Sequence, residues 1–310
     1  MKFAIFPYAI HCTFDQGGVV PHYPASMLRG AFGYALKQVS CMLPKTACEA
    51  CPLKQSCPYI QVFQPQILKS NIATPYLIQP VHLGKQVVEP HQSYVFHFML
   101  LGEAANAQLP LLIYAWQKAL KKGLGKQRMT AQLTSVQHLP AEQTIWQKGE
   151  EGCMTEVPWL NEEWGGLETK IAQQGVQLQI QTPLRLTHYG KRVGAREFHF
   201  SLFLLALKRR LEALQIYIPN LPQLIDEQIR WAGLAEVKSQ VQWHDWSRYS
   251  NRQKQKMTLG GLLGKMQVQF DNKAHIEALL PALWLGQFVN LGKNTVFGMG
   301  HYQLLNLEDG

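Results

Sequence analysis

The most constraining feature of the sequence is the order in which two hydrophobic periods alternate along residues 175–310. Residues 176–186 place apolar side chains at every second position, which predicts a β-strand. Residues 196–214 place them three and four apart, which predicts an amphipathic helix. We expect further strands near 237–244 and at 262–270, a helix at about 279–290 with Pro281 in its first turn, and a last strand at about 300–306. This order predicts a split β-α-β unit.

The first half of the chain repeats the same order less regularly. It predicts strands at about 2–13, 60–68, 93–101 and 129–137, with helices at 24–39 and 107–122. In both halves the second helix leads into a basic turn that contains glycine, at 123–128 and at 292–300. We therefore expect an α+β protein with two tandem ferredoxin-like (βαββαβ) domains, at 1–140 and 175–310. The length of 310 residues suits two domains.

An acidic segment, 141–174, is expected to link the two domains. It contains glycine, proline and tryptophan without a steady period, which is typical of a linker or a long loop. Seven of the 21 acidic residues fall between 140 and 170: Glu142, Glu150, Glu151, Glu156, Glu162, Glu163 and Glu168. Because the net charge is +9, the rest of the chain is more basic than the total indicates. This balance favours a polyanionic partner without identifying one.

Composition excludes two classes of protein. Hydrophobic residues make up 46% of the chain and charged residues 16%, which excludes an intrinsically disordered chain. No apolar run is long enough to span a membrane, and the N-terminal residues lack the cleavage site of a signal peptide. We therefore expect a cytoplasmic protein with no membrane partner.

The turn LGKNTVFGMGHY contains the sharpest local pattern. Its glycines allow a close backbone approach, and exposed N–H groups in such a turn can bind phosphate oxygens. It matches neither a Walker A loop nor a dinucleotide fingerprint, because it lacks Gly-Lys-Ser/Thr and lies between a helix and a strand. The residues predicted to bind RNA here are Gly292, Lys293, Asn294, Gly298 and Gly300. The alternative is a plain turn from helix to strand.

A second basic segment alternates cations with aromatic residues. Arg248, Arg252, Lys254 and Lys256 fall in a stretch without acids, and Trp243, Trp246 and Tyr249 are close in the sequence. Aromatic rings stack on bases and arginine binds phosphates, so the segment predicts contact with RNA. The alternative is a solvated surface.

Four cysteines predict a metal site. Cys41, Cys48, Cys51 and Cys57 lie close together in CMLPKTACEACPLKQSC. A Cys-x-x-Cys pair supplies two thiolates from one turn, and the flanking pair completes a tetrahedral shell. Structural zinc is the first expectation. An iron–sulfur cluster and four free thiols are the alternatives, and four protein ligands would leave no position for catalysis.

Taken together, these segments resemble the CRISPR precursor-RNA processing endoribonucleases of the RAMP superfamily, in a subfamily with a four-Cys insert in the N-terminal domain. The segments that carry the resemblance are the glycine-rich turn, TPLRL (182–186), the helix with Arg209 and Arg210, residues 243–264, LRGAFGYAL (28–36), the four-Cys segment and GLGKQR (123–128). Each motif is short, but their order covers nearly the whole chain.

The resemblance implies a function and a set of residues. It implies binding of CRISPR repeat RNA and metal-independent cleavage, in which the 2′-hydroxyl attacks the adjacent phosphate to leave a 2′,3′-cyclic phosphate and a 5′-hydroxyl. CRISPR effector or adaptation proteins are the further partners it suggests. The alternative is a non-catalytic subunit that binds repeat RNA.

In this family the catalytic histidine lies at or near the first helix, which implicates His22 as the proton-transfer residue. Tyr34 and Lys37 would orient the substrate and neutralise charge. Arg29 would contact RNA or pack inside the domain. The competing histidines are His188, the second choice, and His11, His199, His244 and His301.

Overall fold

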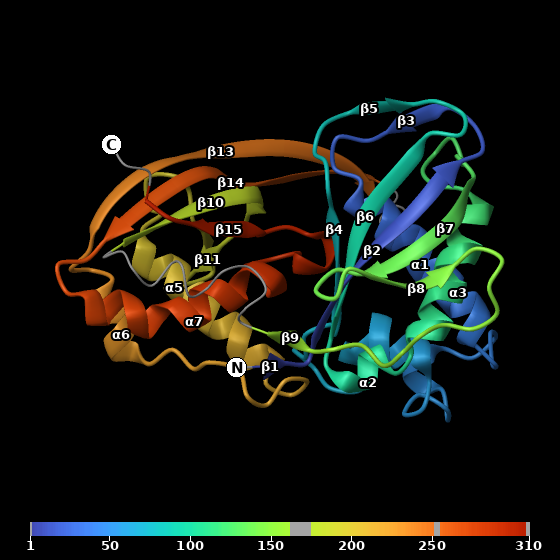
Figure 1. Cartoon of the computed structure of the whole chain (residues 1–310), viewed down its shortest axis with the longest axis horizontal. Helices are drawn as coiled ribbons and strands as arrows, with labels where there is room; N and C mark the ends of the chain where they lie inside the picture. The colour runs from blue at the N-terminus through green and yellow to red at the C-terminus, as the bar shows by residue number, and fades with distance from the viewer. Residues whose placement is uncertain (1, 162–174, 251–254, 308–310) are drawn as a thin grey trace. The chain divides into compact units, whose positions relative to one another are not determined.

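The computed structural model describes residues 2–161, 175–250 and 255–307 (Figure 1). The chain divides into two compact units. The N-terminal unit is Ala4–Leu160, and the C-terminal unit is Asn161–Gly310 together with Met1–Phe3. Each contains an antiparallel sheet and helices, which confirms an α+β protein with two domains. In the described residues no helix is long and apolar enough to cross a membrane.

The sheet of the N-terminal unit has the order β4-β6-β2-β7-β8. Its strands are β2 (Ile5–Phe14), β4 (Tyr76–Pro80), β6 (Ser93–Leu101), β7 (Ala131–His138) and β8 (Gln143–Gln147). The two main helices are α1 (Ala25–Ser40) and α3 (Leu109–Lys122). Their apolar faces supply Phe32 and Trp116, whose stacked rings lie 4.7 Å apart and are fully buried. The short elements are β3 (Gly18–Val20), β5 (Gln86–Val88), β9 (Leu160–Asn161) and α2 (Glu103–Asn106).

The sheet of the C-terminal unit has the order β13-β14-β10-β15. Its strands are β10 (Gly175–Leu184), β13 (Glu236–Ser250), β14 (Gln255–Gln269) and β15 (Tyr302–Leu305). Its helices are α5 (Phe200–Leu214), α6 (Asp226–Trp231) and α7 (Lys273–Val289), and its short strands are β1 (Lys2–Phe3), β11 (Thr187–His188) and β12 (Lys191–Arg192). The buried rings of Phe203 and Tyr302 join α5 to β15 with centroids 5.0 Å apart.

The two units share one strand order. When the four strands around the two main helices are numbered along the chain, each sheet runs second, third, first, fourth, and every described pairing between these strands is antiparallel. The first strand therefore lies in the centre of each sheet. Its C-terminal end leads into the loops in which the candidate site residues lie.

One predicted strand is wrong. Residues 60–68 form a π-helical turn (Tyr59–Phe63) and a 3-10 turn (Pro65–Ile67), and the second strand is β4 instead. The short apolar run fits a helical turn equally well, since Tyr59, Ile60 and Phe63 are all buried. The ring of Phe63 packs directly on Gly33 of α1, where a Cβ would clash with it.

Two boundaries also differ from the prediction. The N-terminal unit extends past residue 140, because β8 of the expected linker pairs with β7 in the sheet. Helix α7 begins at Lys273, so Pro281 lies in its interior and not in its first turn. The side chain of Asn272 caps that earlier start by accepting the N–H of Ala274 over 2.9 Å.

Candidate functional site

The glycine-rich turn follows α7 and is bonded back onto the end of β10. The N–H of Lys293 donates to the carbonyl of Arg185 over 2.9 Å, and the N–H of Gly300 donates to that of Pro183 over 3.1 Å. A Cβ on Gly292 would clash with the Arg185 carbonyl oxygen. These glycines therefore serve a close approach of two backbone segments within one unit.

Only part of this turn can meet a ligand. Gly298 and Gly300 are buried, and the carbonyl of Gly298 accepts the hydroxyl of Thr182 over 2.7 Å. Burial and internal hydrogen bonds occupy these two glycines, so the structure gives no support to RNA binding by them. Gly292 and Lys293 are exposed and Asn294 is half-buried, so RNA binding by these three stays a prediction.

A small hairpin extends from the same end of β10. Strands β11 and β12 pair His188 with Lys191, and the turn between them is Tyr189–Gly190. The guanidinium of Arg192 lies 4.6 Å from the ring centroid of Trp243 on β13. Sequence reasoning did not select Tyr189, Lys191 or Arg192 as candidate site residues. The signal available was an aromatic residue before glycine, flanked by basic residues.

The predicted basic segment is part of a long hairpin. Strands β13 and β14 pair from Glu236↔Gln269 to Ser250↔Gln255, whereas β14 pairs with β10 only from Leu262 onward. Arg248 lies on β13 and Lys256 on β14, and their side chains lie outside the described part of the structure. Arg252 and Lys254 fall entirely outside the described residues. RNA binding by these four residues stays a prediction.

His22 lies in the loop between β3 and α1. The side chain is exposed, and the carbonyl accepts the N–H of Gly84 over 3.0 Å. Pro21 and Pro24 flank the pair His22–Tyr23, and Tyr23 is buried. Two prolines, a buried ring and a backbone hydrogen bond hold the backbone of His22 in place and leave its imidazole exposed.

The structure does not bring Tyr34 and Lys37 beside His22. At 1.5 Å per residue, Tyr34 lies about 14 Å along α1 from Ala25, the residue at which the helix begins. The amino group of Lys122 lies 3.9 Å from the Tyr34 ring centroid, and a hydrogen bond from Lys122 lowers the pKa of Tyr34. The amino group of Lys37 lies 5.7 Å from the Tyr59 ring. This exposed face of α1 fits substrate binding better than proton transfer.

Arg29 packs inside the N-terminal unit. Its guanidinium carbon lies 4.2 Å from the ring centroid of Phe63. Burial raises the pKa of Tyr76 to about 12, and the nearby charge of Arg29 acts in the opposite direction. Of the two roles considered for Arg29, packing is the one that these contacts support. The prediction that Arg29 binds RNA has no support in this geometry.

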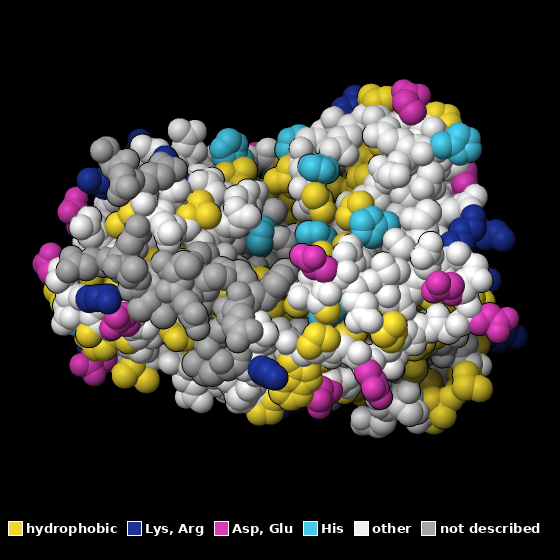
Figure 2. All heavy atoms as spheres, in the orientation of Figure 1, with side chains coloured by type: hydrophobic (Ala, Val, Ile, Leu, Met, Phe, Trp, Pro, Cys, Tyr) yellow, Lys and Arg dark blue, Asp and Glu magenta, His cyan; other side chains and the backbone are white. Residues whose placement is uncertain are grey.

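The competing histidines have different environments. On the face shown in Figure 2, histidine side chains gather over the sheet of the N-terminal unit. His11 on β2 and His97 on β6 share one face of that sheet by register, and burial together with the charge of His11 lowers the pKa of His97. Sequence reasoning missed His97. The available signal was a single histidine within the otherwise apolar run of residues 95–101, which forms part of β6.

The other competitors lie in the C-terminal unit. The carbonyl of His199 accepts the Leu202 N–H in the first turn of α5, and Nδ1 of His301 lies 3.0 Å from the Gln287 carbonyl oxygen. His244 is exposed on β13, and His188 is half-buried with its ring 4.2 Å from that of Tyr189.

The four-Cys segment follows α1. Cys41 caps the helix, and the Cys51 N–H donates to the Cys48 carbonyl over 3.3 Å. The thiols of Cys41, Cys48, Cys51 and Cys57 are all half-buried, and none forms a disulfide. Among the described residues, no three His, Cys, Asp or Glu side chains gather as a metal site. As placed, the thiols do not form a tetrahedral shell, so zinc stays a prediction.

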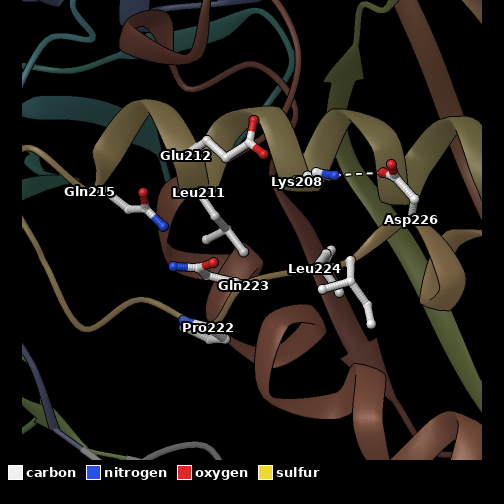
Figure 3. Close-up of a pocket in the computed structure, with 9 residues that line it drawn as sticks. Lys208, Leu211, Glu212, Gln215, Pro222, Gln223, Leu224 and Asp226 are labelled. Carbon is white, nitrogen blue, oxygen red and sulfur yellow. Dashed lines mark hydrogen bonds and ion pairs between the residues drawn. The ribbon is translucent and has the colours of Figure 1, made fainter.

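A cavity of about 350 Å³ lies between α5 and the segment before α6 (Figure 3). Lys208 and Asp226 form an ion pair of 2.6 Å at its edge, and Glu212 and Gln215 also line it. Its lining contains no histidine, and its lysine is neutralised by Asp226. The cavity is therefore not a candidate for RNA cleavage.

Two family models together match most of the chain. One, described as an N-terminal domain, matches residues 3–158. The other, described as CRISPR-associated endoribonuclease Cas6, matches residues 178–302, which include the β10 end, the β11–β12 hairpin and the glycine-rich turn. The chain belongs to the Cas6 family of endoribonucleases. This confirms the resemblance read from the sequence, apart from the four-Cys metal insert.

Solved Cas6 structures share the fold. Thermus thermophilus Cas6 is 15% identical with a TM-score of 0.54, over 98% of this chain and 100% of that one. A product complex of the same protein is 18% identical with a TM-score of 0.55, over 97% of this chain and 99% of that one. A partial Cas6-RT-Cas1–Cas2 complex gives 14% identity and a TM-score of 0.57, over 99% of this chain and 47% of that one. No protein with a curated description matches the sequence.

Proposed function

We propose that this Cas6-family chain cleaves precursor CRISPR RNA within its repeats, without a catalytic metal. The observation that carries the proposal is the Cas6 match over residues 178–302, where a cationic hairpin follows β10 and an exposed lysine-bearing turn is hydrogen-bonded to the end of that strand. The strand order common to both sheets supports assigning both units to the ferredoxin-like class. A role in CRISPR RNA processing also assigns the chain to the cytoplasm.

The proposed reaction is an internal transesterification. The 2′-hydroxyl loses its proton to a base and attacks the adjacent phosphorus, the bond from phosphorus to the 5′-oxygen breaks, and an acid protonates that oxygen. The products are a 2′,3′-cyclic phosphate and a 5′-hydroxyl. A cation beside the phosphate stabilises the extra negative charge of the transition state.

His22 is the residue we assign to proton transfer. An imidazole can take up and return a proton near neutral pH, and that of His22 is exposed on a loop fixed by two prolines. Tyr34 and Lys37, farther along α1, are assigned to substrate binding, with Lys122 added from the structure. In the C-terminal unit Gly292, Lys293 and Asn294 are assigned to the RNA backbone.

Partners of this chain follow from the same assignment. The first is CRISPR repeat RNA. A Cas6 protein has been solved in a complex named Cas6-RT-Cas1–Cas2, which supports CRISPR adaptation proteins as further partners here.

The test uses the purified chain, a repeat-containing RNA and a metal chelator. We expect a product that ends in a 2′,3′-cyclic phosphate. His22→Ala should slow cleavage by about 10²- to 10⁴-fold while RNA binding persists. His188→Ala tests the second choice in the same assay and should still cut at the normal rate when the RNA is saturating.

The outcomes separate the alternatives. Normal cleavage by His22→Ala would overturn the residue assignment, and loss of cleavage in His188→Ala alone would transfer the role to His188. Wild-type protein that binds the RNA without cutting it would identify a non-catalytic repeat-binding subunit. Wild-type protein that does not bind the RNA would refute the proposed function.

Structural zinc at Cys41, Cys48, Cys51 and Cys57 is a separate proposal, supported by their spacing and by the turn that joins Cys48 to Cys51. Thiolates hold zinc tightly, so natively prepared protein should contain one zinc per chain by elemental analysis. Replacing Cys48 and Cys51 by serine should release it and lower the Tm. Iron and acid-labile sulfide would indicate a cluster instead, and protein without metal would refute both.

A further inference from the structure

We infer that the β11–β12 hairpin stacks an unpaired nucleobase on Tyr189 while Arg192 binds an adjacent phosphate. The inference rests on the proposed function, because it adds a single-stranded subsite to an RNA-binding protein. It concerns residues of the C-terminal unit that have no role in the proton-transfer steps.

The conformation of the turn is the first reason. Tyr189 and Gly190 connect strands that pair His188 with Lys191, and both have positive φ, 45° and 75°. A two-residue hairpin turn of this kind favours Asn or Gly at its first position, and a tyrosine there is strained. Strain of this kind is retained where a side chain serves a function.

The exposure of the ring is the second reason. Tyr189 is 91% exposed, so its ring covers almost no protein surface. It is nevertheless held in place, since the His188 ring contacts it edge-on with centroids 4.2 Å apart. Beneath the turn the N–H of Val193 donates to the carbonyl of Leu186 over 3.1 Å, and both side chains are buried. The hairpin thus exposes the face of the Tyr189 ring to solvent, while buried residues and a backbone hydrogen bond hold the foot of the hairpin in place.

The position of Arg192 is the third reason. Its guanidinium stacks on Trp243, whose Nε1 donates to a carboxylate oxygen of Asp245 over 2.8 Å. The indole lies across Gly260 of β14, where a Cβ would come within 2.7 Å of it. In the described part of the chain no carboxylate pairs with Arg192 or Lys191. A guanidinium fixed by stacking keeps its N–H edge for a phosphate.

This chemistry identifies the ligand as single-stranded RNA. An exposed ring can stack on any unpaired base, whereas the faces of paired bases are already covered by their neighbours. The N–H of Lys293 donates to the carbonyl of Arg185, two residues before β11, so the glycine-rich turn and the hairpin meet the chain at the same end of β10.

The experiment measures fluorescence anisotropy of a short labelled single-stranded RNA and of a hairpin RNA of the same composition. Tyr189→Asn should weaken binding of the single strand about fivefold or more and leave the paired RNA nearly unaffected. Tyr189→Phe should bind normally, since the ring is kept. Arg192→Ala should weaken both and reduce the salt dependence of binding.

Two controls exclude folding effects. Asn suits the left-handed region, so Tyr189→Asn should have a Tm equal to or above that of wild type. Tyr114→Ala removes another tyrosine, 45% exposed on α3 with a lysine 4.9 Å from its ring, and should leave RNA affinity unchanged.

A 2-aminopurine base in the single strand gives a direct signature, because stacking on a ring changes its fluorescence. The change should appear with wild type and Tyr189→Phe and be lost with Tyr189→Asn. Wild-type binding of single-stranded RNA with no loss in Tyr189→Asn would overturn this inference alone. No RNA binding by wild type would refute the proposed function as well.

Discussion

The turns that lead from the second main helix to the fourth strand of the shared order differ between the two units in how they are held. In the C-terminal unit the turn 291–300 bonds to the end of β10 by backbone groups, as in the pair Lys293 to Arg185. In the N-terminal unit the turn 123–128 closes on itself through the bridge Leu124↔Met129, and the side chain of Gln127 accepts the N–H of Val19 over 3.0 Å.

This difference explains the sequence patterns of the two turns. Where backbone approaches backbone, side chains are excluded and glycine becomes obligatory at several positions. Where a side chain makes the contact, fewer positions need glycine: in the turn 123–128 only Gly123 would place a Cβ against backbone, at the carbonyl oxygen of Arg128. Both turns still expose cations, Lys293 in one and Lys126 with Arg128 in the other. The glycine pattern therefore reports packing, and the exposed cations carry the RNA-binding potential.

Gly300→Ala should have the largest effect on stability. At φ 75° the new Cβ would clash with the Leu291 carbonyl oxygen, so the backbone link between α7 and β15 must shift. We expect the free energy of unfolding to fall by about 3 kcal/mol or more, measured by urea denaturation. An unchanged midpoint would show that the close backbone approach does not hold this turn.

Acid should destabilise the N-terminal unit through a buried histidine. Burial lowers the pKa of His138 from the ordinary 6.5 to about 4, and the ring is completely inaccessible to solvent. The folded state therefore has its full stability above pH 6.5. It loses stability as the pH falls from 6.5 to 4, because in that range His138 takes up a proton only in the unfolded chain. The loss amounts to about 3 kcal/mol.

Urea unfolding at several pH values checks this. His138→Phe should flatten the dependence over the same window, and tryptophan or hydrogen-exchange signals of the N-terminal unit should respond before those of the C-terminal unit. An equal acid response in wild type and the variant would contradict the assignment.

The order of strands and helices was predictable because burial imposes the periods 2 and 3.6 on the sequence. The error at 60–68 shows the limit of that signal: in a short apolar run, such as Tyr59–Phe63, the two periods cannot be distinguished. The pairing of β8 was missed because the acidic composition around it indicated a linker.

The site was less predictable, because its contacts join segments distant in sequence. Arg29 precedes Gly30 and Gly33 in the sequence, and nothing local shows that it lies against Phe63 and near Tyr76. Similarly, the sequence places His22 just before α1 and Tyr34 within it, but it does not show that the length of the helix keeps the two side chains apart. The family was recognisable because it depends on the order of motifs and not on any one contact.

Gly125→Ala is the matched test for the turn of the N-terminal unit. Its φ is 69°, but the nearest atom to a new Cβ is the sulfur of Met27 at 3.0 Å, the end of a flexible side chain. We expect a loss of only about 1 kcal/mol, from the left-handed backbone alone. A loss as large as that of Gly300→Ala would mean that the two turns are held in the same way.

The smallest expected effect separates packing from RNA binding in the C-terminal turn. Lys293→Ala removes an exposed charge but keeps the backbone N–H that donates to Arg185, so the Tm should stay at the wild-type value. If Lys293 neutralises one phosphate, the slope of log affinity against log salt should fall by about 0.7 to 0.9. Anisotropy titrations of single-stranded RNA at several salt concentrations measure it, with Lys126→Ala as the counterpart in the other turn. A lowered Tm with an unchanged slope would assign Lys293 to packing, and the exposed part of the glycine-rich turn would then have no role in binding RNA.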